Sequence, residues 1–549
     1  MRTWILALLV AGLCAAVPAA ALADEPVVDP RDLKLRELEA RLEATERQLR
    51  AQSGLEPAAQ IEDEEDDGGG LVVPAENIFT VDDVTERNDK IPTLEERLAA
   101  LEKKFKASSE PKPEKKKTEY PTIKITGFTQ FDTAYYSQTP LNEKTVGNAQ
   151  DGMGFRRARL AIFGKAAENT GYQLEVDFAT AGRPSFFDTY LDQAQIPYIG
   201  TIRAGHFLQP FSIDAMSGFR NLPFLERSLP FLSFVPFRRI GIMAFNSAED
   251  EMTSWGYSMF RTGGFNNAPL GDDRSAVDIG NVGGYSFSSR ITHLMMYEEG
   301  DKLLWHVGGG YNYSQLGANN AVGSGTPGNA GSPEPFYQAK TTPEFGPLGY
   351  VENSANFGSA VNSTPIFIDT GRFQANNFNL FGVETMYQDG PLSIQSEYMA
   401  TLVDSVAGQI FYHGAYAEVM YRLTGEHRPY DKKFGALKNV TPFEEFISFN
   451  GENKGIVGWG AWEIAARLSY VELRNPSSLD GHYYNSTTNK FDTTNKAGNG
   501  TLTDSTLGVT WFMTAHSKLQ FNWIHAFLNN SAKGFSSADL FVMRAQVDF

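Results

Sequence analysis

Apolar side chains recur at every second position in many segments after residue 120, and this period constrains the fold more than any other feature. In 157–162 the apolar Ala158, Leu160 and Ile162 alternate with Arg157, Arg159 and Ala161, and the same pattern returns in 123–135, 173–178, 461–470 and 518–523. A period of two is typical of a β-strand with one apolar and one polar face. The chain is therefore predicted to form strands that separate an apolar medium from water.

Composition agrees with strands that cross a membrane rather than helices. No stretch after the N-terminus approaches the ~18 to 20 consecutive apolar residues that a membrane helix needs. Hydrophobic residues make up 42% of the chain, aromatic residues 12%, and glycine contributes 51 residues, which suits half-polar strands. About 430 residues at roughly 25 to 27 per strand and connection give about 16 to 18 antiparallel strands. A barrel of that width would enclose an aqueous lumen.

The last ten residues decide between a membrane barrel and a large water-soluble β protein. Within 540–549 apolar side chains occupy alternate positions, and the sequence stops on the aromatic Phe549. This pattern resembles the closing strand and assembly signal of bacterial outer-membrane proteins, although an ordinary final strand could also end on Phe. We therefore expect an all-β transmembrane barrel, over 120–549, in a Gram-negative type outer membrane.

The N-terminus reads as an export signal. An apolar run from Trp4 to Val17 follows Arg2, and the small residues Ala21 and Ala23 provide a cleavage site, so 1–23 is expected to be a signal peptide. The only cysteine, Cys14, lies inside it. The mature chain is thus expected to have no disulfide, thiolate metal site or cysteine nucleophile.

Residues 24–119 are expected to lie in the periplasm as short coiled-coil segments separated by linkers. Apolar residues at heptad spacing form one seam in 35–49 and a second in 91–105, while 62–70 is acidic and glycine-rich and 111–117 is rich in Pro and Lys. The alternative is a pair of amphipathic helices that lie on another surface. Such a segment could contact the cell wall, and an envelope-tethering role is one rival function.

Motifs for other functions do not occur. The chain has no G-x-S-x-G, H-E-x-x-H or P-loop pattern, and its eight histidines show no ligand spacing, so no enzyme, metal or cofactor is expected. The formal net charge of −18 argues against nucleic acid as a partner.

Several runs resemble the phosphate-selective porin O/P family, in order along 120–549. They are Phe155–Leu160, Arg203–Phe207, Glu226–Ser228, Arg239–Gly241, Gly390–Tyr398, Leu423–Glu426 with Arg428 and Tyr430, and Gly460–Glu463 continuing to Arg467. The resemblance implies a homotrimer of sixteen-stranded barrels, each with an inward-folded loop that forms the constriction. It also implies passive uptake of small anions, phosphate or polyphosphate, past basic side chains.

The arginines near the expected constriction loop are the candidate anion path. Within 203–239 only Asp214 and Glu226 are acidic, so the loop is locally basic in an acidic protein. Guanidinium groups offer charge and paired N–H donors that match phosphate oxygens. The candidates are Arg157, Arg159, Arg203, Arg220, Arg227, Arg238 and Arg239. Alternatively, these arginines pair with strand carboxylates such as Glu175 or Asp177 and hold the loop against the wall.

Two further points bear on the channel. Phenylalanines and prolines crowd 210–237, which predicts a stiff, apolar constriction. A second long connection, 315–365, carries few charges and is expected to be a surface loop, with insertion into the lumen as the alternative. A general-diffusion porin, which predicts little preference between anions and cations, is the main rival to the anion channel.

Overall fold

The computed structural model describes residues 119–549, apart from 180–184, 263–283, 299, 317–335, 346–363, 372, 406–407, 447–457, 475–482, 486–489 and 493–498. The signal peptide expected over 1–23 and the coiled-coil segments expected within 24–119 lie outside the described residues and stay predictions.

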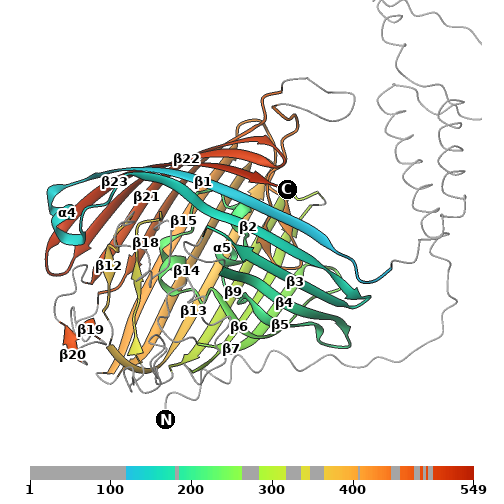
Figure 1. Cartoon of the computed structure of the whole chain (residues 1–549), viewed down its shortest axis with the longest axis horizontal. Helices are drawn as coiled ribbons and strands as arrows, with labels where there is room; N and C mark the ends of the chain where they lie inside the picture. The colour runs from blue at the N-terminus through green and yellow to red at the C-terminus, as the bar shows by residue number, and fades with distance from the viewer. Residues whose placement is uncertain are drawn as a thin grey trace, which may run out of the picture. The chain divides into compact units, whose positions relative to one another are not determined.

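Sixteen antiparallel strands form a closed barrel (Figure 1). Each strand pairs with its neighbours in the barrel, and the last pairs with the first from Phe128↔Asp548 to Gln138↔Ala538. The strands are β1 (Lys124–Gln138), β2 (Gly152–Ala167), β3 (Thr170–Asp177), β4 (Ser185–Ile196), β5 (Gly200–Leu208), β6 (Arg238–Ser247), β7 (Thr253–Arg261), β8 (Tyr285–Tyr297), β9 (Leu303–Gln315), β13 (Phe373–Asp389), β14 (Leu392–Ser405), β15 (Gly408–Arg422), β18 (Ala461–Glu472), β21 (Gly500–Thr514), β22 (Ser517–Asn530) and β23 (Gly534–Asp548). The predicted fold class and strand number are confirmed.

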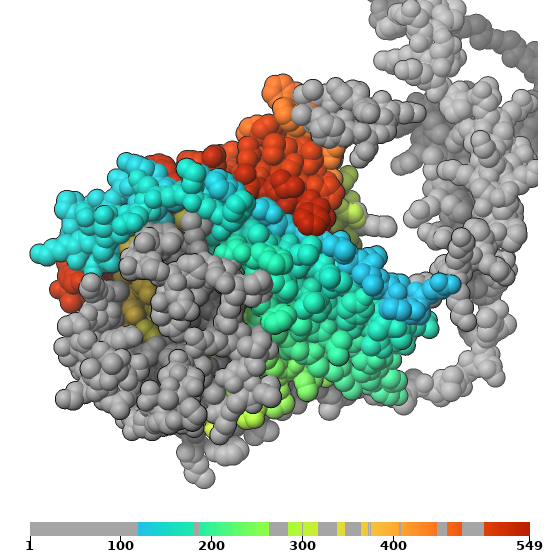
Figure 2. All heavy atoms as spheres, viewed as in Figure 1, coloured from blue at the N-terminus to red at the C-terminus, as the bar shows by residue number. Residues whose placement is uncertain are grey.

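The alternation of side chains places apolar residues outside the barrel. On β18, Ile464 and Leu468 are 43% and 57% exposed, whereas Glu463 and Arg467 are buried on the inner face. Figure 2 shows the first strands, in blue and green, next to the red last strands on one side of the barrel. Among the residues that the structure describes, no helix is both long enough and apolar enough to span a bilayer.

The two rims of the barrel differ in their connections. One rim, which we call the lower rim, carries short turns such as 168–169, 390–391 and 515–516 together with the start of β1 and the end of β23. The upper rim carries long connections such as 139–151, 209–237 and 316–372, the first of which contains α4 (Pro140–Val146). Outer-membrane barrels have short periplasmic turns and long outer loops. By this rule we expect the lower rim to face the periplasm.

Three segments fold inward from the rims. The constriction loop (209–237) descends from the upper rim and contains α5 (Ile213–Met216), η2 (Phe219–Asn221) and α6 (Leu229–Phe234). The upper insert (336–345 and 364–371) contains β10 (Phe336–Tyr337), β11 (Lys340–Thr341) and β12 (Ile368–Asp369). The lower insert (423–446) rises from the lower rim with the hairpin β16 (Tyr430–Asp431) and β17 (Ala436–Leu437). A small hairpin, β19 (Tyr483–Asn485) with β20 (Lys490–Asp492), completes the strands.

The upper insert corrects one expectation. The connection 315–365 was predicted to be a surface loop, and for its described part that prediction is wrong. Tyr337 and Phe345 are at most 2% exposed, as is Phe367 just beyond it, and they belong to one apolar core with α6. Glu344 accepts hydrogen bonds from Arg467 of β18 and Thr506 of β21, both at 2.6 Å. The insert therefore occupies the lumen.

Candidate functional site

Glycines of the barrel wall receive the rings of the constriction loop. The Phe211 ring lies against Gly310 of β9 and Gly382 of β13, where an added Cβ would lie 2.8 Å from ring carbons. Similar close contacts place Phe224 at Gly508, Pro230 at Gly414 and Pro210 at Gly256. A residue without a side chain lets a ring approach the strand backbone closely. The inner wall is thus shaped to hold this loop in one position.

A carboxylate at the tip of the loop is held by three guanidinium groups. Glu226 accepts hydrogen bonds from Arg156 and Arg157 of β2 and from Arg544 of β23, each at 2.9 Å. Arg544 also pairs with Asp132 of β1 at 2.7 Å. Burial would raise the pKa of the Glu226 carboxyl, but the three guanidinium groups hold it well below its usual range. We call this group of five residues the Glu226 latch.

Backbone carbonyls of the same loop bind the far wall of the lumen. Arg467 of β18 donates to the carbonyl oxygen of Glu226 at 3.0 Å, and Lys518 of β22 donates to that of Arg220 at 2.9 Å. The Leu229 N–H donates to Ser469 Oγ at 2.9 Å. The loop therefore crosses the lumen, and hydrogen bonds at residues 220, 226 and 229 hold its middle part against the strands β18 and β22.

Four of the predicted arginines gather around one aromatic ring of the loop. The guanidinium carbons of Arg157, Arg227, Arg159 and Arg238 lie 3.7, 3.9, 4.9 and 5.9 Å from the centroid of the Phe219 ring. We call this arrangement the Phe219 cluster. A guanidinium over an aromatic face is stabilised by the ring quadrupole, so these four guanidinium groups are held in place by packing against Phe219.

The members of the Phe219 cluster also have oxygen partners. Arg159 pairs with Asp177 at 2.8 Å and lies 3.9 Å from Glu175, as the structural alternative anticipated. Arg238 binds Asp188 through two hydrogen bonds of 2.9 and 2.8 Å. Arg227, 1% exposed, donates to three backbone carbonyls of its own loop, those of Asp214, Ala215 and Ser217.

The remaining predicted arginines lie elsewhere. Arg203 binds Asp192 through two hydrogen bonds of 2.8 Å and lies over the Tyr190 ring. Arg239 is buried and lines a small cavity near Phe378. Arg220 on η2 is neither buried like Arg239 nor ion-paired like Arg203.

Arg220 is partly exposed, and its guanidinium donates a long hydrogen bond of 3.4 Å to Thr126 Oγ1 and lies 5.4 Å from the centroid of the Phe128 ring. Among the residues that the structure describes, it has no carboxylate within 4.0 Å. The Asp548 carboxyl interacts with this guanidinium electrostatically from beyond that distance, so the charge of Arg220 is only partly compensated.

The lower insert supports the constriction loop from the other side. Arg428 pairs with Glu463 of β18 at 2.7 Å and donates to the backbone carbonyl of Asn221 in η2. The Asn221 amide donates to the Leu437 carbonyl at 2.9 Å, and the Leu437 N–H donates to Ser217 Oγ at 3.0 Å. The two segments therefore meet inside the lumen.

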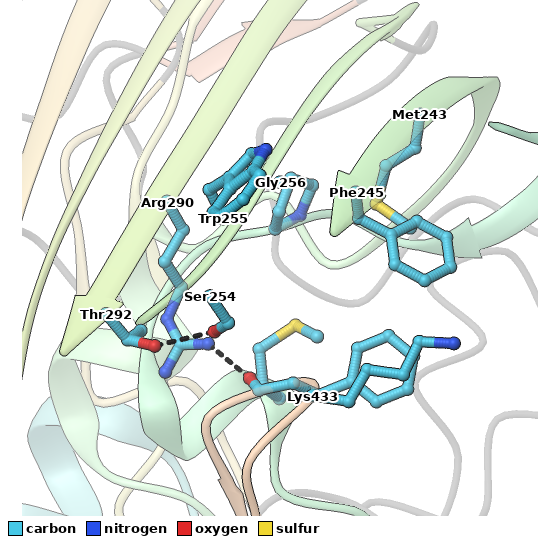
Figure 3. A pocket seen from close by; sticks show the side chains of 11 residues that line it. Met243, Phe245, Ser254, Trp255, Gly256, Arg290, Thr292 and Lys433 are labelled. Atoms are coloured by element: carbon cyan, nitrogen blue, oxygen red, sulfur yellow. Dashed lines mark hydrogen bonds between the residues drawn. The ribbon is translucent and has the colours of Figure 1, made fainter. Parts of the chain in front are cut away.

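A cavity of about 30 Å³ lies where the loop, strands β6–β8 and the lower insert meet (Figure 3). Arg290 borders it and donates to the carbonyls of Phe434 and Gly435 at 2.6 and 2.7 Å. Lys433 and Phe245 line the same space. A volume of this size suits ordered water rather than a solute.

Charge is unevenly distributed around the inner wall. Among the described residues of β13 to β21, five carboxylates and two arginines are buried, whereas β1 to β6 bury three carboxylates and four arginines. The acidic wall holds Glu384, Glu397, Glu418, Arg422, Glu463, Arg467 and Asp504, and the basic wall holds Asp132, Arg157, Arg159, Glu175, Asp177, Arg238 and Arg239. The two sides of the wall therefore differ in their ratio of buried carboxyl to guanidinium groups.

Comparison with known proteins identifies the family of the chain. The family model for phosphate-selective porin O and P matches residues 123–549. The chain belongs to this family. It is 25% identical over 423 residues to Porin O of Pseudomonas aeruginosa, a match that covers 73% of this chain and 83% of that protein.

Solved structures with a similar fold include OmpT of Vibrio cholerae in a trimer form (TM-score 0.42, 11% identity, 78% of this chain and 99% of that chain). Another is the channel DcaP of Acinetobacter baumannii (TM-score 0.42, 10% identity, 78% and 97%). Membership of the porin O and P family makes the barrel a channel of the outer membrane.

The runs that carried the family resemblance now have positions in this porin. Glu226–Ser228 is the tip of the constriction loop, Leu423–Glu426 opens the lower insert, and Glu463 of Gly460–Glu463 binds that insert through Arg428. The sequence did not predict that Arg156, Arg544 and Arg428 hold the constriction. Only the family pattern around Leu423–Glu426 could have pointed to the lower insert.

Proposed function

We propose that this porin passes small anions, phosphate foremost, and that Arg220 provides most of the selectivity. The observation that carries the proposal is that the guanidinium of Arg220, on the constriction loop, is partly exposed and has no described carboxylate within 4.0 Å. Several of the other predicted arginines are held by carboxylates or carbonyls, so they contribute less net field. They are proposed to line the path and to hold the constriction loop, which carries Arg220, in position.

Physical chemistry favours this division of roles. An anion that enters a narrow lumen loses part of its hydration, and a guanidinium with open N–H donors offsets that loss. Arg220 is partly exposed, whereas Arg227 is 1% exposed and has its donors directed at backbone carbonyls. A solute could therefore reach Arg220 without breaking an existing ion pair.

The test is single-channel recording of the purified full chain under a chloride gradient. We expect an anionic reversal potential and current block by phosphate, and Arg220→Ala should weaken the block by about tenfold, equivalent to ~1.4 kcal/mol. The control is Arg474→Ala, which removes an arginine paired with Glu472 and 45% exposed. An Arg220→Ala channel with unchanged selectivity would refute the assigned role.

A general-diffusion channel is the second candidate, because the acidic and basic sides of the inner wall would together set up a transverse field. Such a field orients dipolar solutes without selecting one sign of charge. Weak or cationic selectivity of the unmodified channel, with no phosphate block, would favour this candidate and remove phosphate as the permeant.

We also propose a homotrimer. On the outward faces of β22 and β23, Asp539 accepts hydrogen bonds from Trp523 at 2.8 Å and from His525 at 2.7 Å. The two side chains of the His525–Asp539 pair are 26% and 32% exposed. Polar groups on a lipid-facing surface are costly, so contact with another protomer accounts for this pair better than contact with lipid.

A substitution in the His525–Asp539 pair distinguishes contact with another protomer from contact with lipid. Asp539→Leu should weaken the trimer if the pair lies between protomers, and unheated gel migration or native mass would then show monomers at lower temperature. If the pair faces lipid, the same change should leave the oligomer at least as stable. The outward Trp305→Leu on β9 serves as the control, since β9 lies far from β23 around the barrel.

A further inference from the structure

An exposed apolar patch lies on the lower rim, where β15 and β21 end and β18 begins. Its side chains come from the lower insert and from the residues just before β18. They are Leu423, Phe443 and Trp459, which are 58%, 69% and 79% exposed. We call these three residues the rim patch. Large apolar groups clustered in this way indicate a surface that meets another apolar phase.

The rim patch continues the aromatic residues on the outer face of the barrel. Trp462 of β18 and Trp511 of β21 stack with ring centroids 5.3 Å apart. Both indole N–H groups donate to the backbone carbonyl of Trp459, at 3.1 and 2.9 Å. The Phe446 ring packs edge-on against Trp511 with centroids 4.8 Å apart. These contacts fix the rim patch directly beside outward-facing tryptophans.

The lower insert contacts both sides of the barrel wall. Val440 is fully buried with Ala461 and Phe512, on the inner face of β18 and β21. A few residues later Phe446 contacts Trp511 outside, and its N–H donates to the Met513 carbonyl at 2.7 Å. The chain therefore crosses the rim between these positions, and the exposed ring of Phe443 lies at the crossing.

We propose that the rim patch inserts into the interfacial zone of the periplasmic leaflet of the outer membrane and anchors the lower insert to lipid. Tryptophan and other aromatic rings concentrate at this depth, where apolar rings leave water and indole N–H groups stay near polar partners. The occupant is assigned as lipid because the rim patch is continuous with the lipid-facing tryptophans. A separate protein partner would have to compete with that bilayer edge.

The anchor would connect the bilayer to the constriction. The Phe443 N–H donates to the Glu426 carboxylate at 3.1 Å, and two residues after Glu426 in the sequence Arg428 binds the Asn221 carbonyl of the constriction loop. Glu426 and Arg428 are both buried, at 2% and 0% exposure. Lipid contact at Phe443 would thereby hold the base of the insert. This inference does not depend on which solute passes through the channel.

The test uses a fluorophore attached to single cysteines in the full chain, reconstituted in phosphatidylethanolamine and phosphatidylglycerol vesicles. Cys14 is the only native cysteine and lies in the expected signal peptide, so the exported protein provides a background without other thiols. Phe443→Cys is compared with Leu468→Cys on the lipid-facing side of β18 and with Glu249→Cys in the exposed turn before β7. A nitroxide on the lipid headgroup and a water-soluble nitroxide are the two quenchers.

We expect the headgroup-borne nitroxide to quench the Phe443→Cys label at least about threefold more than the Glu249→Cys label. Quenching of the Phe443→Cys label only by the soluble nitroxide, at the level of Glu249→Cys, would overturn the proposal. So would shielding that arises only after periplasmic extract is added, because the rim patch would then bind protein.

A second measurement keeps the native ring at position 443. Trp459→Ser with Leu423→Ser should lower the quenching of the lower insert by lipid, read from a label at Glu444→Cys, which is exposed and adjoins Phe443 at the rim. Unchanged quenching at this site after both substitutions would also contradict the assignment. Gel mobility with and without heating verifies that each variant forms the barrel.

Discussion

Glu226→Ala is expected to release the constriction loop and raise the single-channel conductance. The substitution leaves the guanidinium groups of Arg156, Arg157 and Arg544 without the carboxylate that they share at 2.9 Å. Removal of one partner from a buried ion pair typically costs about 3 to 5 kcal/mol. The barrel ladder does not include Glu226, so the strands should stay paired while the loop moves.

Conductance of the purified channel in a planar bilayer measures this effect, and circular dichroism with heat-dependent gel mobility checks the barrel. Glu226→Gln separates charge from shape, since it keeps the size of the side chain and should produce a smaller rise. Glu472→Ala, which removes the partner of Arg474, is the control and should conduct like the unmodified channel. If Glu226→Ala conducts at the original level, the Glu226 latch does not position the loop.

Local periodicity made the barrel predictable. Membrane thickness fixes the length of each strand, and the period of two determines which face meets lipid, so strand number follows from chain length. The segment around Arg157 and Arg159 illustrates this, because both side chains face inward as the alternation predicted. Their inward direction was a property of one strand and required no knowledge of its neighbours.

The contacts of these arginines were less predictable because they depend on distant residues and on a local irregularity. The register of β1 with β2 shifts between Gln130 and Phe131, so that it passes from Arg157 to Phe155 and skips Arg156. A bulge lets consecutive side chains point to the same side, which is why Arg156 joins Arg157 at Glu226. Arg544 reaches Glu226 across 318 residues of sequence. Period-two reading alone predicts neither contact.

The inserts show where composition is ambiguous. The low charge of 315–365 suggested an exposed loop, yet low charge suits burial equally well, and Tyr337 and Phe345 are core residues. The lower insert begins with Leu423–Glu426, a run that indicated the family but did not show whether the following chain enters the lumen or stays outside it. Its inward path depends on Arg428 and Glu463, which are separated along the chain by most of the insert.

Gly310→Val is expected to unseat the start of the constriction loop and to give larger, noisier single-channel currents. A Cβ at position 310 would lie 2.8 Å from the Phe211 ring, which is fully buried. Added methyl groups in a packed interior typically cost about 1 to 3 kcal/mol. The neighbouring Gly309→Val is a matched control, because a Cβ there has its nearest neighbour at 3.7 Å.

The cause is isolated by a double-mutant cycle with Phe211→Ala. If the added side chain acts by striking the ring, Gly310→Val should change the conductance of the unmodified channel but have little further effect once Phe211 is alanine. Equal effects of Gly310→Val in both backgrounds would mean that valine perturbs β9 itself. The loop would then be positioned by the Glu226 latch and its backbone hydrogen bonds rather than by the contact of Phe211 with the wall glycines. The conductance of these variants therefore distinguishes the two anchors of the loop. One anchor is electrostatic, at Glu226, and the other is steric, at Phe211.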